Sequence, residues 1–366
     1  MATGDSSTVV VNDNATVLQI DLHQCADADD ENADTTPIVD ELVRLLPKRN
    51  KKPYLHILGF GDLLSQVTIG ELWHTPRIFR EYKADLTDDA KKFREEADRR
   101  RKLMIKNGNA VESGDRLRVI GHDEGIFKDE KYKDFPKEAR SYPGQSIEFL
   151  DGEDYVGTFE AFIHAPFKPK EDSDETRNNS SLALQITLTE GTGVGKALFF
   201  GDREYPTIKQ VFDITKERER DQYLEWNVQL AAHHCSKKVM FWKDDGSDKE
   251  TYRKDLIEDF ENAAFEGAYI VASCRSDFTD GEGDNPPHSK AREKYEGIVD
   301  AGHFLCTHEY PTKDDLQPIV FSVGSDGFGS DDKQTRSKGP SGLAAAVTAA
   351  RGAEKPPGSQ VGFGPL

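Results

Sequence analysis

Two short segments place residues that bind metals or transfer protons at the ends of predicted buried strands. V-Q-L-A-A-H-H-C-S, from Val228 to Ser236, is an apolar run that stops on His233 and His234. K-A-L-F-F-G-D-R-E, from Lys196 to Glu204, has the same design and carries Asp202 after its apolar part. Short apolar runs without polar alternation are typical of strands buried on both faces. A carboxylate and imidazoles at two such strand ends predict, in outline, a metal site at a sheet edge.

These residues also have an explanation that needs no ligand. His233 and His234 could end a strand with hydrogen bonds to neighbouring loops, and Asp202 could cap a helix that begins at Pro206. Cys235 could be a soft zinc ligand or a nucleophile, although a small buried side chain that fills space is the simpler interpretation. On these residues alone, both explanations stay open.

Composition restricts the class of protein. The chain has 366 residues, enough for a large core, and a formal net charge of -19. This charge argues against a broad basic face for nucleic acid but allows a small nucleotide held at a metal. Four scattered cysteines favour a reducing compartment. With no signal pattern and no apolar run of about 18 residues, we expect a cytoplasmic protein without a membrane span.

The pattern of elements predicts an α/β protein. A strand at Thr16–Leu22, a helix from Pro37, a strand at Tyr54–Leu58 and a further edge at Glu71–Pro76 alternate along the first part. Alternating strands follow from residue 116, then the two key strands with a helix from Pro206 to about Arg220 between them. The expected later elements are a helix at 250–264, a buried strand A-Y-I-V-A-S-C, a helix at 288–301 and a last strand H-F-L-C-T-H.

Two regions are expected to differ from this core. A long charged helix begins at Thr87 and stops at Asn107-Gly108, forming an insertion at about residues 84–108. Its acidic first turn and basic last turn match the helix dipole better than they match a phosphate site. From about Gly324 the composition turns to Gly, Ser, Lys, Pro and Ala, which predicts a folded domain at 1–323 and a flexible tail at 324–366.

The order of motifs resembles that of metallo-β-lactamase-fold hydrolases of the ComEC-like branch. Those proteins show N-x-x-S-L-V-L, F-T-G-D and P-H-H-G-S. This chain has N-N-S-S-L-A-L, F-F-G-D and A-A-H-H-C-S in the same order, after a strand L-Q-I-D-L. The match covers most of residues 16–307. The resemblance implies a four-layer αββα sandwich and a site for one or two zinc ions. It further implies Asp202 as a carboxylate ligand and His233 or His234 as an imidazole ligand.

One motif of the family is missing. Active members carry H-x-H-x-D-H after the second strand, whereas in this chain Y-L-H-I-L runs directly into Gly59-Phe60-Gly61-Asp62. A catalytic zinc needs about three protein ligands, so further ligands are required. His164, at a strand end, is taken with Asp202, His233 and His234 as the expected ligand set. The other candidates are His56, Asp62, His74 and His122; a core histidine explains the first more simply, and a helix cap the second.

Three functions follow from these observations. The first is a zinc-dependent hydrolase acting on a phosphodiester or nucleotide-type bond. The second is an inactive relative that keeps the fold as a binding or regulatory subunit, with the charged helix as a candidate surface for a protein partner or a homo-oligomer. The third is a sequence from which one segment has been lost, in which case the natural protein is the hydrolase.

Overall fold

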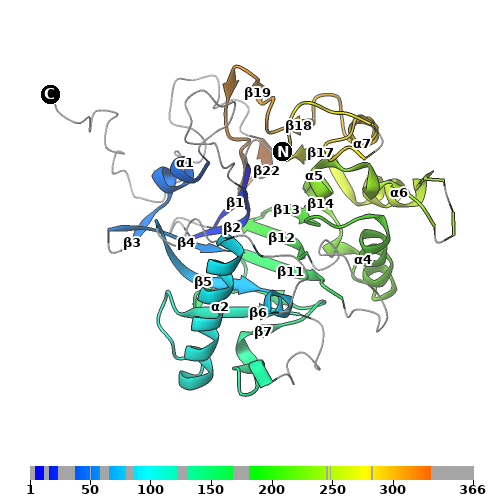
Figure 1. Cartoon of the computed structure of the whole chain (residues 1–366). Coiled ribbons are helices and arrows are strands. Elements are labelled where there is room, and N and C mark those ends of the chain that lie inside the picture. Colours follow the sequence, from blue (N-terminus) through cyan, green and yellow to red (C-terminus); the bar gives the residue numbers. More distant parts are fainter. Residues whose placement is uncertain are drawn as a thin grey trace, which may run out of the picture.

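A computed structural model of the chain describes most of residues 5–330. It shows an α/β protein built on two mixed sheets (Figure 1). The described residues are 5–11, 16–23, 38–49, 51–57, 66–79, 86, 88–121, 130–167, 181–244, 246–247, 249–281 and 283–330.

The first sheet contains the amino-terminal strands, and its members are mostly parallel. Its strands are β1 (Asp5–Val11), β2 (Thr16–His23), β3 (Lys48–Arg49), β4 (Lys52–Ile57), β5 (Thr68–His74), β6 (Arg116–Ile120) and β7 (Arg140–Ser141). The order is β1-β2-β4-β5-β6-β7, with β3 paired to β4. Strands β2 to β7 run parallel along this path, and β1 is antiparallel to β2. Helices α1 (Ile38–Leu45) and α2 (Asp88–Asn107) pack on one face, sharing a core with β4, β5 and β6.

The second sheet contains the predicted site strands. Its strands are β8 (Ser146–Ile147), β11 (Phe159–Ala165), β12 (Ala183–Glu190), β13 (Gly193–Phe199), β14 (Trp226–Leu230), β17 (Ala264–Ala272) and β18 (Phe304–Cys306). The order is β18-β17-β14-β13-β12-β11-β8. Strands β13, β14, β17 and β18 are parallel. Helices α4 (Tyr205–Glu217), α6 (Lys254–Ala263) and α7 (Ser289–Glu296) cover its outer face.

Three apolar cores show how the layers stack. One lies between the sheets, with Leu18 and Trp73 from the first sheet and Ile163 and Ile186 from the second. The other two lie between each sheet and its own helices. Figure 1 accordingly shows α1 and α2 on one side of the molecule and α4, α6 and α7 on the other. This arrangement is consistent with a sandwich, in which sheets and helices bury their apolar faces against one another.

Most predicted elements are present, and two of the differences concern strands. The predicted strand near residues 146–150 is divided: β8 joins the second sheet, while β9 (Phe149–Leu150) pairs with β10 (Glu153–Asp154) in a separate hairpin. A hairpin of β21 (Phe321–Gly324) and β22 (Gly327–Ser330) extends regular structure past residue 323. It approaches β13 so closely that a Cβ added at Gly193 would meet the carbonyl oxygen of Gly324, so the glycines of β13 permit this contact.

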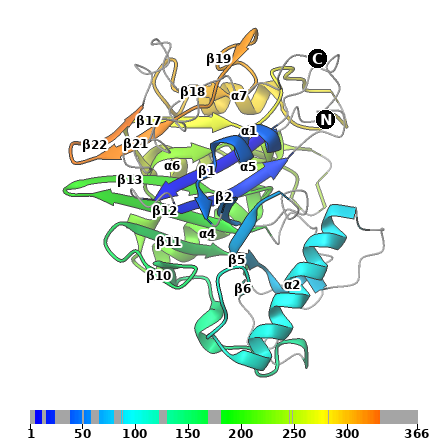
Figure 2. The ribbon, with the colours of Figure 1, turned by 90° about the vertical axis from the view of Figure 1, so that its left-hand side faces the viewer.

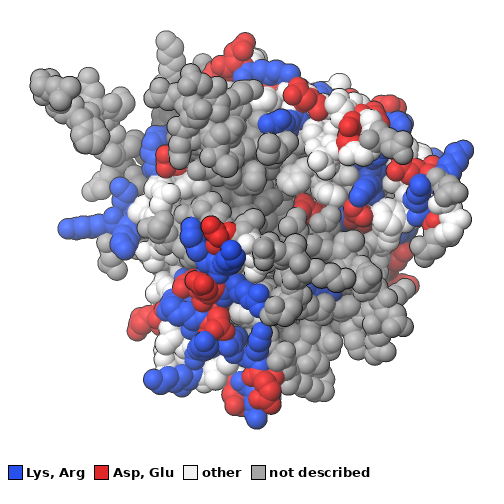
Figure 3. All heavy atoms as spheres, in the orientation of Figure 1, with Lys and Arg blue, Asp and Glu red and all other residues white. Residues whose placement is uncertain are grey.

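Helix α2 matches the predicted charged helix, and it runs obliquely past β5 and β6 (Figure 2). Its surface carries a dense mixture of positive and negative side chains (Figure 3). Ala97 and Met104 form its buried stripe. None of the described helices combines the length and the apolar character that a membrane span requires.

Candidate functional site

The structure brings Asp202 and His234 together at the ends of two neighbouring strands. Strands β13 and β14 are parallel partners, so the residues that follow them lie at the same edge of the sheet. The His233 amide donates to the Gly201 carbonyl at 2.9 Å, which joins the two loops. His234 Nε2 lies 3.4 Å from Asp202 Oδ1, and its Nδ1 lies 2.9 Å from the Ser273 carbonyl oxygen. Because the carbonyl can only accept, Nδ1 carries a proton, so Nε2 presents a lone pair when the ring is neutral and pairs with Asp202 when the ring is protonated.

His233 forms a second imidazole–carboxylate pair. Its Nδ1 lies 3.7 Å from Glu204 Oε1, and Lys238 Nζ lies 3.3 Å from the same oxygen. Among the described residues this buried Nδ1 has no hydrogen-bond partner. Burial lowers the pKa of His233, while the negative charges of Asp202 and Glu204 oppose that shift. His233 is therefore favoured as a neutral imidazole, the form that can act as a ligand or a base.

The backbone of this turn is strained. His233, His234 and Cys235 all have positive φ, of 50°, 52° and 61°, although none is glycine. Each such residue costs about 1–2 kcal/mol, because the Cβ crowds the following carbonyl. Strain of this kind clusters at functional sites. Cys235 is fully buried, and burial raises the pKa of its thiol, which makes it a poor nucleophile.

His164 has a different environment from the other expected ligands. It lies beneath α4, where its Nε2 is 2.8 Å from the Tyr223 carbonyl oxygen and its Nδ1 is 3.3 Å from Thr215 Oγ1. The carbonyl requires a proton on Nε2, so Nδ1 accepts from the Thr215 hydroxyl. Both ring nitrogens are used, and no lone pair is left for a cation in this arrangement.

The remaining histidine and aspartate candidates are separate from the Asp202 pair or lie outside the described residues. His74 Nδ1 bonds the Thr75 carbonyl at 2.8 Å. His56 Nδ1 accepts from the Glu71 amide at 3.3 Å, as expected for a core histidine. Asp62 and His122 lie in segments outside the described residues.

His164 and His74 predict a dependence of stability on pH. Burial lowers the pKa of each from 6.5 to about 4, helped by Arg203 near His164 and Arg101 near His74. Between these pKa values the unfolded chain binds more protons than the folded chain. The contribution of the two histidines to the free energy of unfolding should therefore be fully present above pH 6.5 and be lost as the pH drops towards 4. Urea unfolding across this range measures the effect, and His164→Gln should flatten the slope. A slope unchanged in that variant would contradict the assignment.

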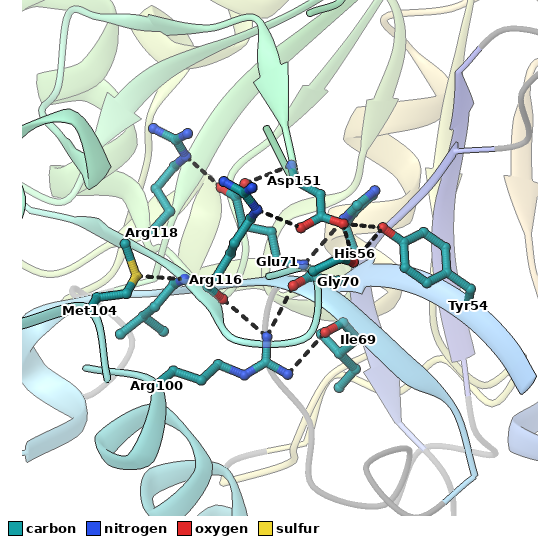
Figure 4. A network of polar contacts seen from close by, with 12 residues as sticks. Tyr54, His56, Ile69, Gly70, Glu71, Arg100, Met104, Arg116, Arg118 and Asp151 are labelled. Atoms are coloured by element: carbon teal, nitrogen blue, oxygen red, sulfur yellow. Dashed lines mark hydrogen bonds and ion pairs between the residues drawn. The ribbon is translucent and has the colours of Figure 1, made fainter. Parts of the chain in front are cut away.

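A second polar cluster, which no motif in the sequence points to directly, is a buried network between the first sheet and the β9–β10 hairpin (Figure 4). Glu71 of β5 is its first centre. Its carboxylate accepts from Arg118 Nε at 2.8 Å, from Trp73 Nε1 at 2.8 Å and from the Asp151 amide at 2.7 Å. With only 4% of Glu71 exposed, these three donors replace the water that a carboxylate needs.

Asp151 is the second centre of this network. It accepts hydrogen bonds from the hydroxyls of Tyr54 and Ser113. Arg116 Nε lies 3.2 Å from its Oδ1. Through these contacts the turn between β9 and β10 is fixed to strands β4 and β6. The R-L-R alternation in β6 is the one sequence signal of this cluster, because residues two apart on a strand share a face.

Arg100 of α2 completes the network from the other face. Its guanidinium donates to the carbonyls of Ile69 at 2.9 Å, Arg116 at 3.0 Å and Gly70 at 3.3 Å, while Nε meets Glu96 at 2.6 Å. The side chain is 3% exposed. The charged helix is therefore attached to the sheet by a buried cation as well as by its apolar stripe.

No protein-family model matches the chain, and no curated protein is significantly similar to it. Within the described ranges, no three His, Cys, Asp or Glu side chains are grouped so that they could hold a metal ion. The described part therefore offers two candidate sites. One consists of the Asp202–His234 and Glu204–His233 pairs, which we call the strand-end cluster, and the other is the polar network centred on Glu71 and Asp151.

Proposed function

We propose that the chain has the metallo-β-lactamase fold and is related to its zinc-dependent hydrolases. The two mixed sheets with helices on their outer faces support this proposal, as does the motif order that ends in F-F-G-D and A-A-H-H-C-S. One observation carries it: Asp202 and His234 follow two neighbouring parallel strands, and Asp202 Oδ1 lies 3.4 Å from His234 Nε2. His234 belongs to a His-His-Cys turn whose backbone is left-handed.

The donor types of the strand-end cluster fit zinc, but the number of donors does not. Zinc is bound by imidazole nitrogen and carboxylate oxygen, and the cluster supplies two pairs of this kind, Asp202 with His234 and Glu204 with His233. The described residues do not group three such donors around one point. They do not by themselves complete a zinc site, and further ligands would have to come from other segments or from a rearrangement of the cluster.

The activity to test first is hydrolysis of a phosphodiester or nucleotide-type bond, for which zinc would supply an activated water. The shortage of grouped donors among the described residues favours a second candidate function, a binding or regulatory subunit that keeps the sandwich without catalysis. Under that function Asp202 and protonated His234 hold the loops after β13 and β14 together as an ion pair rather than as ligands.

Metal content separates these two functions. Protein purified without chelator should contain at least one zinc per chain, measured by mass spectrometry of the metals. Asp202→Asn and His234→Gln should each remove that zinc, because each deletes one ligand of a pair. Asp213→Asn is the matched control, since Asp213 is an exposed carboxylate of α4 paired with Lys209.

The outcomes have distinct meanings. Zinc that is lost in both variants and retained in the control supports the cation site, and turnover of a chromogenic phosphodiester then identifies a hydrolase. Wild-type protein without zinc would overturn the cation site and leave the binding subunit. Insertion of T-H-P-D-x-D-H between Leu58 and Gly59 then tests the hypothesis that a segment has been lost. The protein with the insertion should bind zinc only if the rest of the site is intact.

A further inference from the structure

A cavity of about 780 Å³ lies beside the polar network, between β6, β7 and the β8–β9 segment. No residue of the strand-end cluster lines it, so it is independent of the proposed cation site. Its volume falls within the range of about 300–1,000 Å³ that is usual for small-molecule sites. Charged groups of both signs line it, together with amide side chains and one aromatic ring: Arg116, Arg118, Glu138, Glu148, Gln145 and Phe149.

The two arginines are held in place by buried acids. Arg116 and Arg118 stand on the same face of β6, two residues apart. Arg118 Nε lies 2.8 Å from Glu71 Oε1, and Arg116 Nε lies 3.2 Å from Asp151 Oδ1. Glu71 is 4% exposed and Asp151 is 7% exposed. Each acid thus engages its arginine at Nε (Figure 4), while Arg118 Nη1 donates to the hydroxyl of Ser141, a residue that itself lines the cavity.

Each acid engages its arginine at Nε and accepts from further donors as well, so the terminal nitrogens of the two guanidinium groups can still bind a ligand. Glu71 also accepts from Trp73 and from the Asp151 amide, and Asp151 accepts from two hydroxyls. The Arg116 guanidinium lies flat over Gly152, where an added Cβ would come within 2.8 Å of its Cζ. A side chain at this position would displace the guanidinium, so the glycine allows the arginine to lie against the turn.

We propose that this cavity binds a nucleoside monophosphate, with the phosphate held by Arg116 and Arg118. Planar guanidinium groups hold phosphate oxygens with paired hydrogen bonds, which fits two arginines fixed side by side. Glu138 and Glu148 also line the cavity. Their negative charges oppose a polyphosphate more strongly than a single phosphate group, and their carboxylate oxygens accept hydrogen bonds from hydroxyls such as those of a ribose. Phe149, whose surface is 47% exposed, offers an aromatic face for the base.

Binding of AMP to the full chain, measured by isothermal titration calorimetry, tests this proposal. AMP should bind more tightly than adenosine or inorganic phosphate alone, because the cavity contacts both parts of the ligand. Arg118→Gln should weaken AMP binding about tenfold or more by removing a charged phosphate contact. Arg218→Gln is the control, since Arg218 is an exposed arginine at the end of α4 that does not line the cavity.

A second variant keeps the test decisive if Arg118→Gln does not fold. Phe149→Ala removes an exposed ring and should leave the fold intact. It should weaken AMP binding while leaving the affinity for inorganic phosphate unchanged. The proposal is overturned if the wild-type protein does not bind AMP, if adenosine or inorganic phosphate binds as tightly as AMP, or if Arg118→Gln and Phe149→Ala both bind AMP like the wild type.

Discussion

Replacement of Arg100 with methionine is expected to lower the free energy of unfolding by about 3–5 kcal/mol, the usual cost of breaking a buried ionic network by removing one partner. Arg100 is 3% exposed and donates to the carbonyls of Ile69, Gly70 and Arg116 as well as to Glu96. Methionine fills similar space without any donor, so each of the three carbonyls loses one donor and Glu96 keeps only its pair with Arg99. Urea unfolding followed by circular dichroism measures the change.

The neighbouring arginine of α2 provides the control for this variant. Arg99 pairs with Glu96 and Asp115, but its side chain is 46% exposed. Exposed ion pairs contribute about 0–1 kcal/mol because water and salt screen them. Arg99→Met should therefore change the free energy of unfolding by no more than that. Similar losses in both variants would show that the buried position of Arg100 has no special importance.

Phe260→Ala should have an effect of similar size, about 3–5 kcal/mol, because it removes a buried ring and leaves a cavity where α4, α6 and α7 meet the second sheet. Phe260 of α6 is fully buried, and its ring centroid lies 5.6 Å from Phe212, 6.0 Å from Phe200 and 6.3 Å from Tyr295. The loss therefore combines the transfer free energy of the ring with the contacts of three neighbouring rings. Thermal or urea unfolding measures it.

Phe265→Ala is the matched control for the aromatic core. Phe265 stands five residues later in the sequence on β17, with 39% of its surface exposed. Its replacement should cost less than about 1 kcal/mol, because little apolar area returns to water. An equal loss from both variants would show that burial of Phe260 among the other rings adds nothing to stability.

The α/β class and most elements could be predicted because their signals are local. The charged helix ends at Asn107, as its stop signal predicts, and β2 covers the predicted strand. Strand β1 has no clear signal, since D-S-S-T-V-V-V is polar through its first half. The helix expected to run from His288 to residue 301 ends at Glu296, where Gly297 follows. Strand order depends on contacts distant in sequence, which local patterns do not encode.

The two candidate sites differ in how far the sequence could predict them. Asp202 and His234 follow consecutive strands joined by a helix, and because such strands are usually neighbours in a sheet, the sequence was enough to expect these two residues close together. Arg118 and Asp151 reach Glu71 from 47 and 80 residues away in the chain. No local period links residues at such separations, and only the packing of the hairpin on the first sheet brings them into contact.

The hairpin β21–β22 has a practical consequence for anyone who shortens the chain. Composition would place the cut before residue 324, yet Phe321 and Phe328 of this hairpin lie 5.1 Å and 6.4 Å from the ring of Tyr269. Cutting there would remove β22 and uncover an aromatic surface beside the glycines of β13, inviting self-association through an unprotected apolar patch. A minimal version of this protein should retain Ser330.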